Sequence, residues 1–151
     1  MVRHCHLLGL KPPKQEFRSI GFGLISWPLL CYRTRYQAMK IIERSITLDE
    51  LKTMAGNRFG ELVKAVVDVA TGVMAIDGEL HADEEALLLE QGSRQADLWG
   101  INIYPELAGK DRIEFDSIIN IRPSQGNRSR GVDDPVIREN IFQIVARLVK
   151  E

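Results

Sequence analysis

Apolar and polar positions beyond residue 39 follow two different periods, and each period predicts one kind of element. Alternation with a period of two and short β-branched runs predict five strands, at residues 40–44, 62–69, 73–76, 98–104 and 112–122. Turn residues separate the second strand from the third, and a polar loop separates the fourth from the fifth. Each of these two pairs is therefore expected to form an antiparallel hairpin.

Two helices are predicted from helical spacing together with start signals at their N-termini. Thr47 and Glu50 form a capping box, in which the threonine hydroxyl accepts from the Glu50 amide and the Glu50 carboxylate reaches back. Asp134 is the expected N-cap of the last helix, and Pro135 is its expected first residue. The apolar stripe that follows Pro135 indicates that this helix packs on the core.

Residues 84–91 fit two interpretations, a short helix or a strand. Asp83 is suited to cap a helix that carries Glu84 and Glu85 in its first turn. Four consecutive apolar residues have no clear period, however, so a strand over 86–90 stays open. The elements together predict an α+β domain, with an antiparallel sheet of four to five strands and two or three helices packed mostly on one face.

Composition is that of an ordinary soluble domain, but charge is unevenly distributed along the chain. The sequence is 44% hydrophobic and 27% charged, with a net charge of −1. Residues 1–38 hold six Lys and Arg against one acidic residue, which leaves fourteen basic against twenty acidic residues in 39–151. Because residues 39–151 are acidic, charge alone disfavours broad binding to nucleic acid, and any anion site must be local.

Cysteine usage separates the same two parts of the chain. Cys5 and Cys31 both lie in residues 1–38, so residues 39–151 contain neither a disulfide framework nor a cysteine-based zinc site. A cysteine-free acidic domain is typical of a reducing compartment. We therefore expect a cytoplasmic location.

Residues 1–38 do not share the patterning of the domain that follows them. Their apolar run at 20–31 is too short for a membrane span and is interrupted by Pro28. A basic start before an apolar run is similar to a secretory signal, but Arg33 and Arg35 follow the run and no small-residue cleavage site lies close behind it. We interpret residues 1–38 as a disordered extension or an over-extended start, and we expect a single domain over 39–151.

The chemistry of the sequence concentrates in the loop between the fifth strand and the last helix. Arginine binds phosphate or carboxylate through two parallel hydrogen bonds, and glycines allow close approach to backbone amides. The loop combines arginines with small neutral donors, so a small anionic ligand, such as a nucleotide or a phosphorylated metabolite, is the leading partner. The expected ligand-binding residues are Arg122, Ser124, Gln125, Asn127, Arg128, Ser129 and Arg130, with Asn120 and Arg94 in support.

An ordered surface loop is the alternative interpretation of these arginines. Asp133, Asp134, Glu114 and Asp116 are near enough in sequence to pair with them. The loop matches no phosphate-loop or dinucleotide-binding pattern. If strands 98–104 and 112–122 form a hairpin, the loop lies beside residues 93–96, where the two polar segments meet at one edge of the sheet.

His81 is the basis of an enzymatic alternative, because it is the only histidine in residues 39–151. With Asp83 or Glu84 it could serve an acid–base or metal-assisted hydrolase. Its spacing matches no zinc-enzyme motif, and one histidine supplies too few nitrogens for a strong zinc site, so we expect no metal and no cofactor. A third possibility is a protein-interaction module that holds no small ligand.

Three segments carry a resemblance to a known family. They are G-E-L-H-A-D-E-E-A-L-L-L-E-Q-G-S (78–93), L-W-G-I-N-I-Y-P (98–105) and I-E-F-D-S-I-I-N-I-R-P-S-Q-G-N-R-S (113–129). The chain from residue 39 onward resembles a small family of uncharacterised bacterial and archaeal proteins, a domain of unknown function. The resemblance implies a start near Met39 and brings no assigned activity or catalytic residues.

Overall fold

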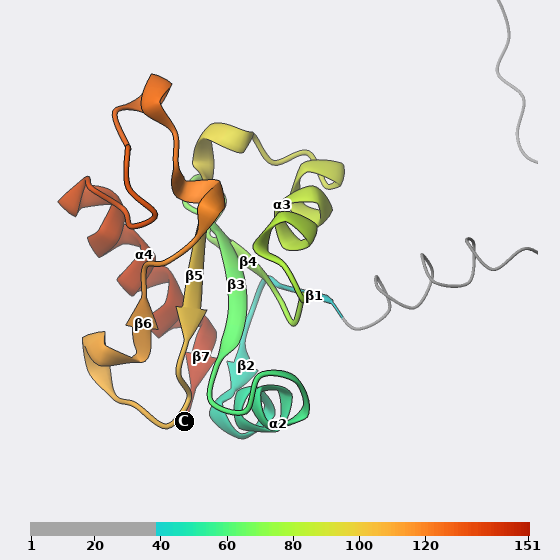
Figure 1. Ribbon diagram of the computed structural model, residues 1–151. Helices are drawn as coiled ribbons and strands as arrows, with labels where there is room; N and C mark the ends of the chain where they lie inside the picture. The colour runs from blue at the N-terminus through green and yellow to red at the C-terminus, as the bar shows by residue number, and fades with distance from the viewer. Residues whose placement is uncertain (1–38) are drawn as a thin grey trace, which may run out of the picture.

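The computed structural model describes residues 39–151, and the expectations for residues 1–38 lie outside them. The main sheet has five antiparallel strands in the order β1-β4-β3-β5-β6 (Figure 1). Hydrogen bonds between adjacent strands confirm both predicted hairpins. The strands are β1 (Lys40–Ile42), β3 (Val63–Asp68), β4 (Val73–Ile76), β5 (Leu98–Ile103) and β6 (Ile113–Glu114). A second, parallel pair joins β2 (Ile46–Thr47) to β7 (Val149–Lys150), next to the C-terminus.

Within residues 39–151, three α-helices accompany the sheet, so the predicted α+β class is confirmed. They are α2 (Leu48–Arg58), α3 (His81–Glu90) and α4 (Pro135–Leu148). Thr47 and Glu50 form the predicted capping box at α2, and the Asp134 side chain caps α4 by accepting from the Val136 amide. None of the helices within residues 39–151 is long and apolar enough to cross a bilayer.

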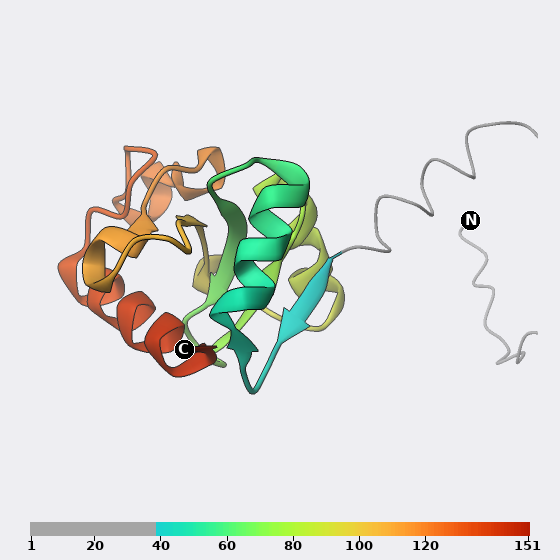
Figure 2. The same cartoon turned by 90° about the horizontal axis from the view of Figure 1, so that it is seen from below.

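The sheet separates two hydrophobic clusters of unequal size. Helices α2 and α4 pack on one face, where Leu51 and Ile141 meet the inward side chains of β3, β4 and β5. Helix α3 lies on the opposite face, and its Leu88 packs with Val66 and Leu98 (Figures 1 and 2). Two of the three helices therefore share one face, as predicted, and the smaller cluster leaves space beside the start of α3.

Helix α3 begins at His81, before Asp83. Residues 81–90 are helical, which excludes the strand alternative, and the N-cap is Leu80 without a side-chain hydrogen bond. Asp83 lies inside the first turn, where its amide donates to the Leu80 carbonyl. The Glu84 carboxylate reaches back to the Gly78 amide at 2.9 Å and holds the preceding turn. The predicted cap at Asp83 is therefore wrong, because Asp83 lies inside the helix and no side chain caps its start.

The predicted strand 112–122 is wrong beyond Glu114. Ile113 and Glu114 pair with β5 in the expected register, with Asn102 opposite Glu114. The chain then forms two 3₁₀ turns, η3 (Ile118–Asn120) and η4 (Pro123–Gln125). Ile113 and Phe115 pack against the larger cluster, whereas Ile119 packs against the smaller one. The side chains that alternate in sequence therefore do not share one face of the sheet.

The cause of the early strand end is the side chain of Asn120. Its Nδ2 donates to the Gly100 carbonyl at 2.9 Å, and its Oδ1 accepts from the Gly100 amide at 2.8 Å. A side-chain amide thus makes the two bonds that a neighbouring strand would make with β5. Ser117 sits against the same glycine, where a Cβ on Gly100 would lie 2.5 Å from its Oγ.

Candidate functional site

Arg122 anchors the arginine-rich loop to the rest of the domain. Its side chain is nearly buried, with Nε donating to the Ile119 carbonyl at 2.9 Å and a terminal nitrogen donating to the Gln95 carbonyl. The other terminal nitrogen lies 3.3 Å from the Glu85 carboxylate on α3. The predicted meeting of this loop with residues 93–96 is therefore present. The Arg122 guanidinium makes the hydrogen bond that joins the loop to this segment.

The two asparagines of this region also make internal contacts. Besides its bonds with Gly100, Asn120 donates to the Arg130 carbonyl at 2.9 Å. The Asn127 amide donates to the carbonyls of Asn120 and Gly131, and its Oδ1 accepts from the Asp133 amide at 2.6 Å. Both side chains are buried. They hold the shape of the loop.

Acidic neighbours engage several of the remaining loop groups. Asp133 accepts from the Ser129 hydroxyl at 2.7 Å and from the Arg128 amide at 3.2 Å, and these bonds hold the pKa of Asp133 below its ordinary value. Arg130 pairs with Asp116 at 2.6 Å. For Ser129 and Arg130, these contacts match the ordered-loop interpretation. The support residue Arg94 pairs with Asp97 at 3.3 Å.

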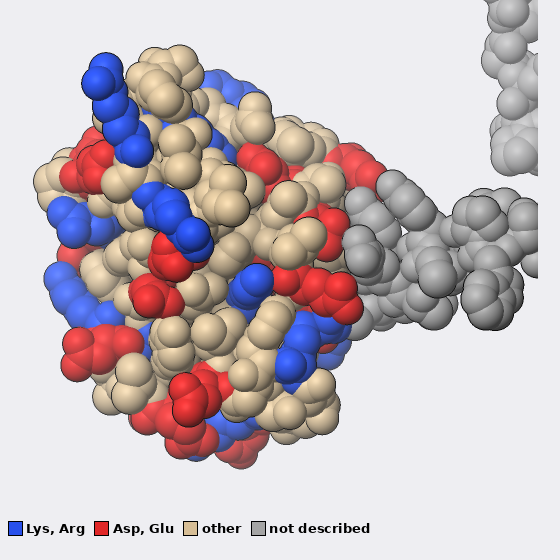
Figure 3. Space-filling model, viewed as in Figure 1, with Lys and Arg blue, Asp and Glu red and all other residues tan. Residues whose placement is uncertain are grey.

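The side chains of Ser124, Gln125 and Arg128 lie on the exposed side of the loop. The predicted ligand-binding residues thus fall into three groups: buried anchors, acid-paired side chains and exposed side chains. Basic and acidic side chains are interspersed over the face of the molecule in Figure 3, without a broad basic area there. That face therefore lacks the broad basic area that is typical of an extended nucleic-acid surface.

A cavity of about 440 Å³ lies next to this loop, between the start of α3, strand β5 and the η3 turn. We call it the α3–β5 cavity. Arg130 from the loop and His81 from α3 line it, so it unites one residue from each of the two predicted sites. Its polar wall consists of Lys64, His81, Asn102, Asp116, Ser117 and Arg130.

His81 stands at the first position of α3, and its imidazole is buried in the cavity wall. Its Nε2 lies 2.8 Å from the Ile101 carbonyl oxygen, which can only accept, so Nε2 carries the hydrogen in the neutral ring. Burial lowers the pKa of His81 below its ordinary value, although the bond to Ile101 opposes this effect. At neutral pH the ring is therefore uncharged, and Nδ1 is a hydrogen-bond acceptor.

Asn102 and Ser117 contribute buried oxygens to the same wall. The Asn102 Oδ1 and the Ser117 Oγ have no hydrogen-bond partner among residues 39–151. Asn102 is 7% exposed and Ser117 is 1% exposed, so bulk water does not satisfy them freely. A buried oxygen without a partner costs about 1–3 kcal/mol, so these two atoms reduce the stability of the fold.

Two basic side chains, one from strand β3 and one from the arginine-rich loop, line the cavity. Lys64, on β3, donates to the Glu79 carbonyl at 3.0 Å and lies 4.8 Å from the centre of the Phe59 ring. Arg130 reaches the cavity from the loop, with Asp116 as its partner. The three formal charges of the wall therefore sum to +1, because His81 is neutral. This balance favours an anionic group.

The entrance of the cavity is apolar. Phe59, Leu80 and Ile118 line it and are 41%, 52% and 71% exposed, which places them among the most exposed large hydrophobic side chains of residues 39–151. Ligand sites commonly combine an apolar lining with a few convergent polar groups. The exposed side chains thus surround a buried polar wall.

The enzymatic pair predicted for His81 does not share the cavity with it. Asp83 and Glu84 lie in the same first turn of α3 but are absent from the cavity wall. Glu84 is fully buried, and this burial raises its pKa from 4.5 to about 8. Among residues 39–151, no cluster of three or more His, Cys, Asp or Glu side chains is arranged to hold a metal ion.

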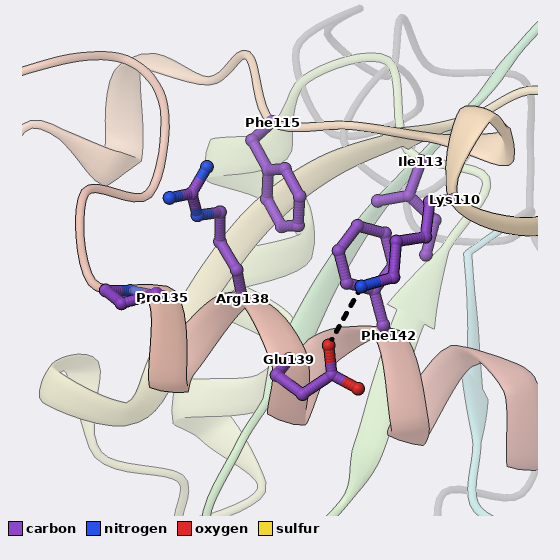
Figure 4. Close-up of a pocket in the computed structure, with 7 residues that line it drawn as sticks. All are labelled: Lys110, Ile113, Phe115, Pro135, Arg138, Glu139 and Phe142. Atoms are coloured by element: carbon purple, nitrogen blue, oxygen red, sulfur yellow. Dashed lines mark hydrogen bonds and ion pairs between the residues drawn. The ribbon is translucent and has the colours of Figure 1, made fainter.

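A second cavity, of about 490 Å³, lies between β6 and α4 (Figure 4). Phe115 and Phe142 meet edge to face across it, with ring centroids 5.4 Å apart. Lys110 covers the Phe142 ring and pairs with Glu139 at 3.1 Å. This wall contains none of the buried oxygens without partners that distinguish the α3–β5 cavity.

Four polar residues of the α3–β5 cavity are absent from the sites predicted from the sequence: Lys64, Asn102, Asp116 and Ser117. Asn102 had a detectable signal, since it is a polar residue within the otherwise apolar strand L-W-G-I-N-I. Lys64 and Ser117 had none, because a lysine in a strand and a serine before a turn are ordinary. Their role depends on the approach of η3 to β5.

The comparisons with known proteins identify a family but no activity. The model of the family DUF5674, described as a protein of unknown function, matches residues 40–148. No curated protein and no solved structure matches the chain.

Proposed function

The chain belongs to the DUF5674 family, and because that family brings no activity, we propose from the geometry that it binds a small anionic ligand in the α3–β5 cavity. Within the arginine-rich loop, the proposal assigns ligand contact to Arg130. Arg122, Asn120 and Asn127 hold the loop in place, and Arg128 stays on the outer surface.

One observation carries the proposal: a net positive polar wall lies in one cavity together with exposed apolar side chains. Lys64 and Arg130 provide the positive charge, and Asn102 and Ser117 are neutral polar residues of the same wall. Each feature alone is common on protein surfaces. Their coincidence in one cavity is typical of a site that accommodates a small molecule with a charged end and an apolar body.

Titration of the full-length protein with inorganic phosphate and adenosine 5′-monophosphate tests the proposal. Two-dimensional amide NMR should show shifts around His81 and Ser117, and calorimetry should give the affinity. Arg130→Gln should weaken binding about tenfold, because it removes a charge-assisted hydrogen bond. Arg128→Gln, an exposed arginine in the same loop, is the matched control and should leave the affinity unchanged.

Two results would contradict the proposal in different ways. Equal losses in Arg128→Gln and Arg130→Gln would assign binding to the outer surface of the loop. Absence of shifts with either compound, at millimolar concentration, would remove the anion site altogether and favour the protein-interaction alternative. Thermal denaturation of each variant, which should match that of the wild type, shows that the fold is retained.

A hydrolase using His81 is the second candidate, and the tautomer of His81 favours it. The bond to Ile101 leaves Nδ1 as the ring nitrogen that can accept a proton, and His81 lines the cavity. Asp83 and Glu84 are not in that wall, so the imidazole would act without the carboxylate partner that the sequence suggests. Release of nitrophenol from p-nitrophenyl phosphate, abolished in His81→Asn, would support hydrolysis. Binding of phosphate without turnover would restrict the protein to ligand binding.

A further inference from the structure

We infer that the ligand of the α3–β5 cavity is an aliphatic carboxylate, such as a free acyl acid of medium chain length, whose charged end contacts Lys64. This inference rests on the proposed function and specifies the ligand of the same cavity. The exposed lining, its one aromatic ring and the Lys64 ammonium each contribute to it.

The exposed apolar side chains of the cavity come from three different elements. Phe59 is the C-cap residue of α2, Leu80 is the N-cap residue of α3, and Ile118 begins η3. Leu80 and Ile118 are each more than half exposed, so neither is needed to fill the core. Burial of apolar surface is favourable, so a hydrocarbon chain in the cavity gains free energy from surface that the fold itself leaves in water.

The lining favours a flexible chain over a planar ring. Within residues 39–151, Phe59 is the only aromatic residue that lines the cavity, and the Lys64 ammonium lies 4.8 Å from the centre of its ring. Nucleobases are commonly held by stacking on aromatic side chains, and here the cation covers one face of the only such ring. The remaining apolar lining is aliphatic: Leu62, Leu80, Ala82, Ile118 and Ile119.

Lys64 is the basic group of the wall that is more available to a carboxylate. Arg130 already holds Asp116 through two bonds, from Nε to Oδ1 at 2.6 Å and from a terminal nitrogen to Oδ2 at 3.0 Å. The Lys64 ammonium donates to the Glu79 carbonyl at 3.0 Å, and no carboxylate of residues 39–151 forms an ion pair with it. An ammonium has three donors, so Lys64 keeps hydrogens for a ligand.

The formal charge of the wall matches one carboxylate. Lys64 and Arg130 against Asp116 leave +1, with His81 neutral. A carboxylate carries one negative charge at neutral pH, whereas a phosphate monoester carries about 1.5 to 2. One carboxylate therefore neutralises the wall, and a phosphate monoester leaves an excess of negative charge beside Asp116.

A series of straight-chain carboxylates tests this ligand class. Acetate, butanoate, hexanoate and octanoate are titrated into the full-length protein by calorimetry, below micelle-forming concentrations, and amide NMR should show shifts around Lys64 and Ile118. Affinity should rise at least twofold with each added methylene, since complete burial of a methylene corresponds to about fourfold. Octanol, which has the same chain without the charge, should bind at least tenfold more weakly than octanoate.

Two variants separate the chain from the charged end. Ile118→Asn should weaken octanoate about fivefold and leave acetate unchanged, because it removes apolar contact only. Val136→Asn is the matched control, since Val136 is 75% exposed against 71% for Ile118 and does not line the cavity. Lys64→Gln should weaken every carboxylate about tenfold and leave octanol unchanged, whereas damage to the fold would affect both.

The outcomes separate this inference from the proposed function. If phosphate binds at the cavity and affinity does not rise with chain length, the aliphatic ligand is overturned and anion binding stands. If adenosine 5′-monophosphate binds more tightly than octanoate, the ligand has a ring instead of a chain, and anion binding again stands. If octanol binds as tightly as octanoate and phosphate does not bind, both are overturned. Both are also overturned if no compound binds and the wild type self-associates while Ile118→Asn stays monomeric, because the apolar side chains then form an interface between copies of the chain.

Discussion

The buried carboxyl of Glu84 offers a quantitative test of the structure through the pH dependence of stability. Glu84 is fully buried, with Oε1 accepting from the Gly78 amide at 2.9 Å and Oε2 lacking a partner among residues 39–151. Burial is the main cause that raises its pKa to about 8; Asp77 and Asp83 add to the rise, while the Gly78 bond and Lys64 oppose it.

The sign of the effect follows from proton linkage. Between pH 4.5 and 8 the folded protein keeps the Glu84 proton, whereas the unfolded chain loses it, so folding becomes less favourable as pH rises. The contribution of Glu84 to the stability of the folded protein is fully present below pH 4.5 and is lost above pH 8. A folded pKa of about 8 against 4.5 corresponds to about 5 kcal/mol, of which about 4 kcal/mol is lost between pH 5 and pH 9.

Glu84→Gln is the perturbation that isolates this contribution. A glutamine oxygen can still accept from the Gly78 amide, and the side chain is neutral at every pH. The free energy of unfolding, measured in urea, should therefore fall between pH 5 and pH 9 in both proteins. The fall should be about 4 kcal/mol smaller in Glu84→Gln than in the wild type. Glu90→Gln, on the exposed surface of the same helix, is the control. Parallel pH profiles for Glu84→Gln and the wild type would refute the reasoning.

Two further stability predictions concern the contact between Asn120 and β5. Asn120→Ala should lower the free energy of unfolding, measured in urea, by about 3 kcal/mol, because it leaves the amide and carbonyl of Gly100 without their partner. Ser124→Ala changes an exposed side chain nearby and should have little effect in the same measurement. Gly100→Ala should lower the melting temperature by several degrees, because the new Cβ would lie 2.5 Å from the Ser117 Oγ. Gly56→Ala, whose Cβ meets nothing within 4 Å on a helix, should instead be neutral or stabilising; a similar response to both glycine changes would contradict the packing described at Gly100.

Local signals in the sequence correctly predict the elements whose determinants are close together in the chain. The capping box of Thr47 and Glu50 is complete within four residues, and the structure confirms it. The hairpin between β5 and β6 also joins two strands that are consecutive in the chain, and it places Asn102 opposite Glu114. In both cases the deciding contact forms between neighbours, so no knowledge of the remaining fold is required.

The incorrect predictions involve side chains that replace backbone partners over long separations. The strand expected to reach Arg122 ends at Glu114 because Asn120 bonds with Gly100, twenty residues away. The cap expected at Asp83 is absent because the helix already begins at His81, and the buried Glu84 carboxyl instead accepts from the Gly78 amide. Alternation and capping preferences describe only local choices, and these two contacts depend on the assembled sheet.

The residues of the candidate site divide in the same way, into those that the sequence indicates and those that depend on the assembled fold. Arg130 and His81 are recognisable as reactive residue types in the sequence, and both line the α3–β5 cavity. Asn102 and Ser117 acquire their significance only where α3, β5 and η3 meet. Residue type therefore indicates where charge and basic nitrogen are available, whereas the polarity of a wall requires the three-dimensional arrangement.

The contact of Asn120 with Gly100 has a consequence for self-association. Strand β6 covers only the end of β5 around Asn102 and Ile103, so the outer edge of β5 at Gly100 would otherwise present a free amide and a free carbonyl. Exposed strand edges recruit strands from other molecules and lead to aggregation. A side-chain amide fills this opening without extending the sheet. Because the amide belongs to one residue, a single substitution there would expose the edge as well as weaken the fold.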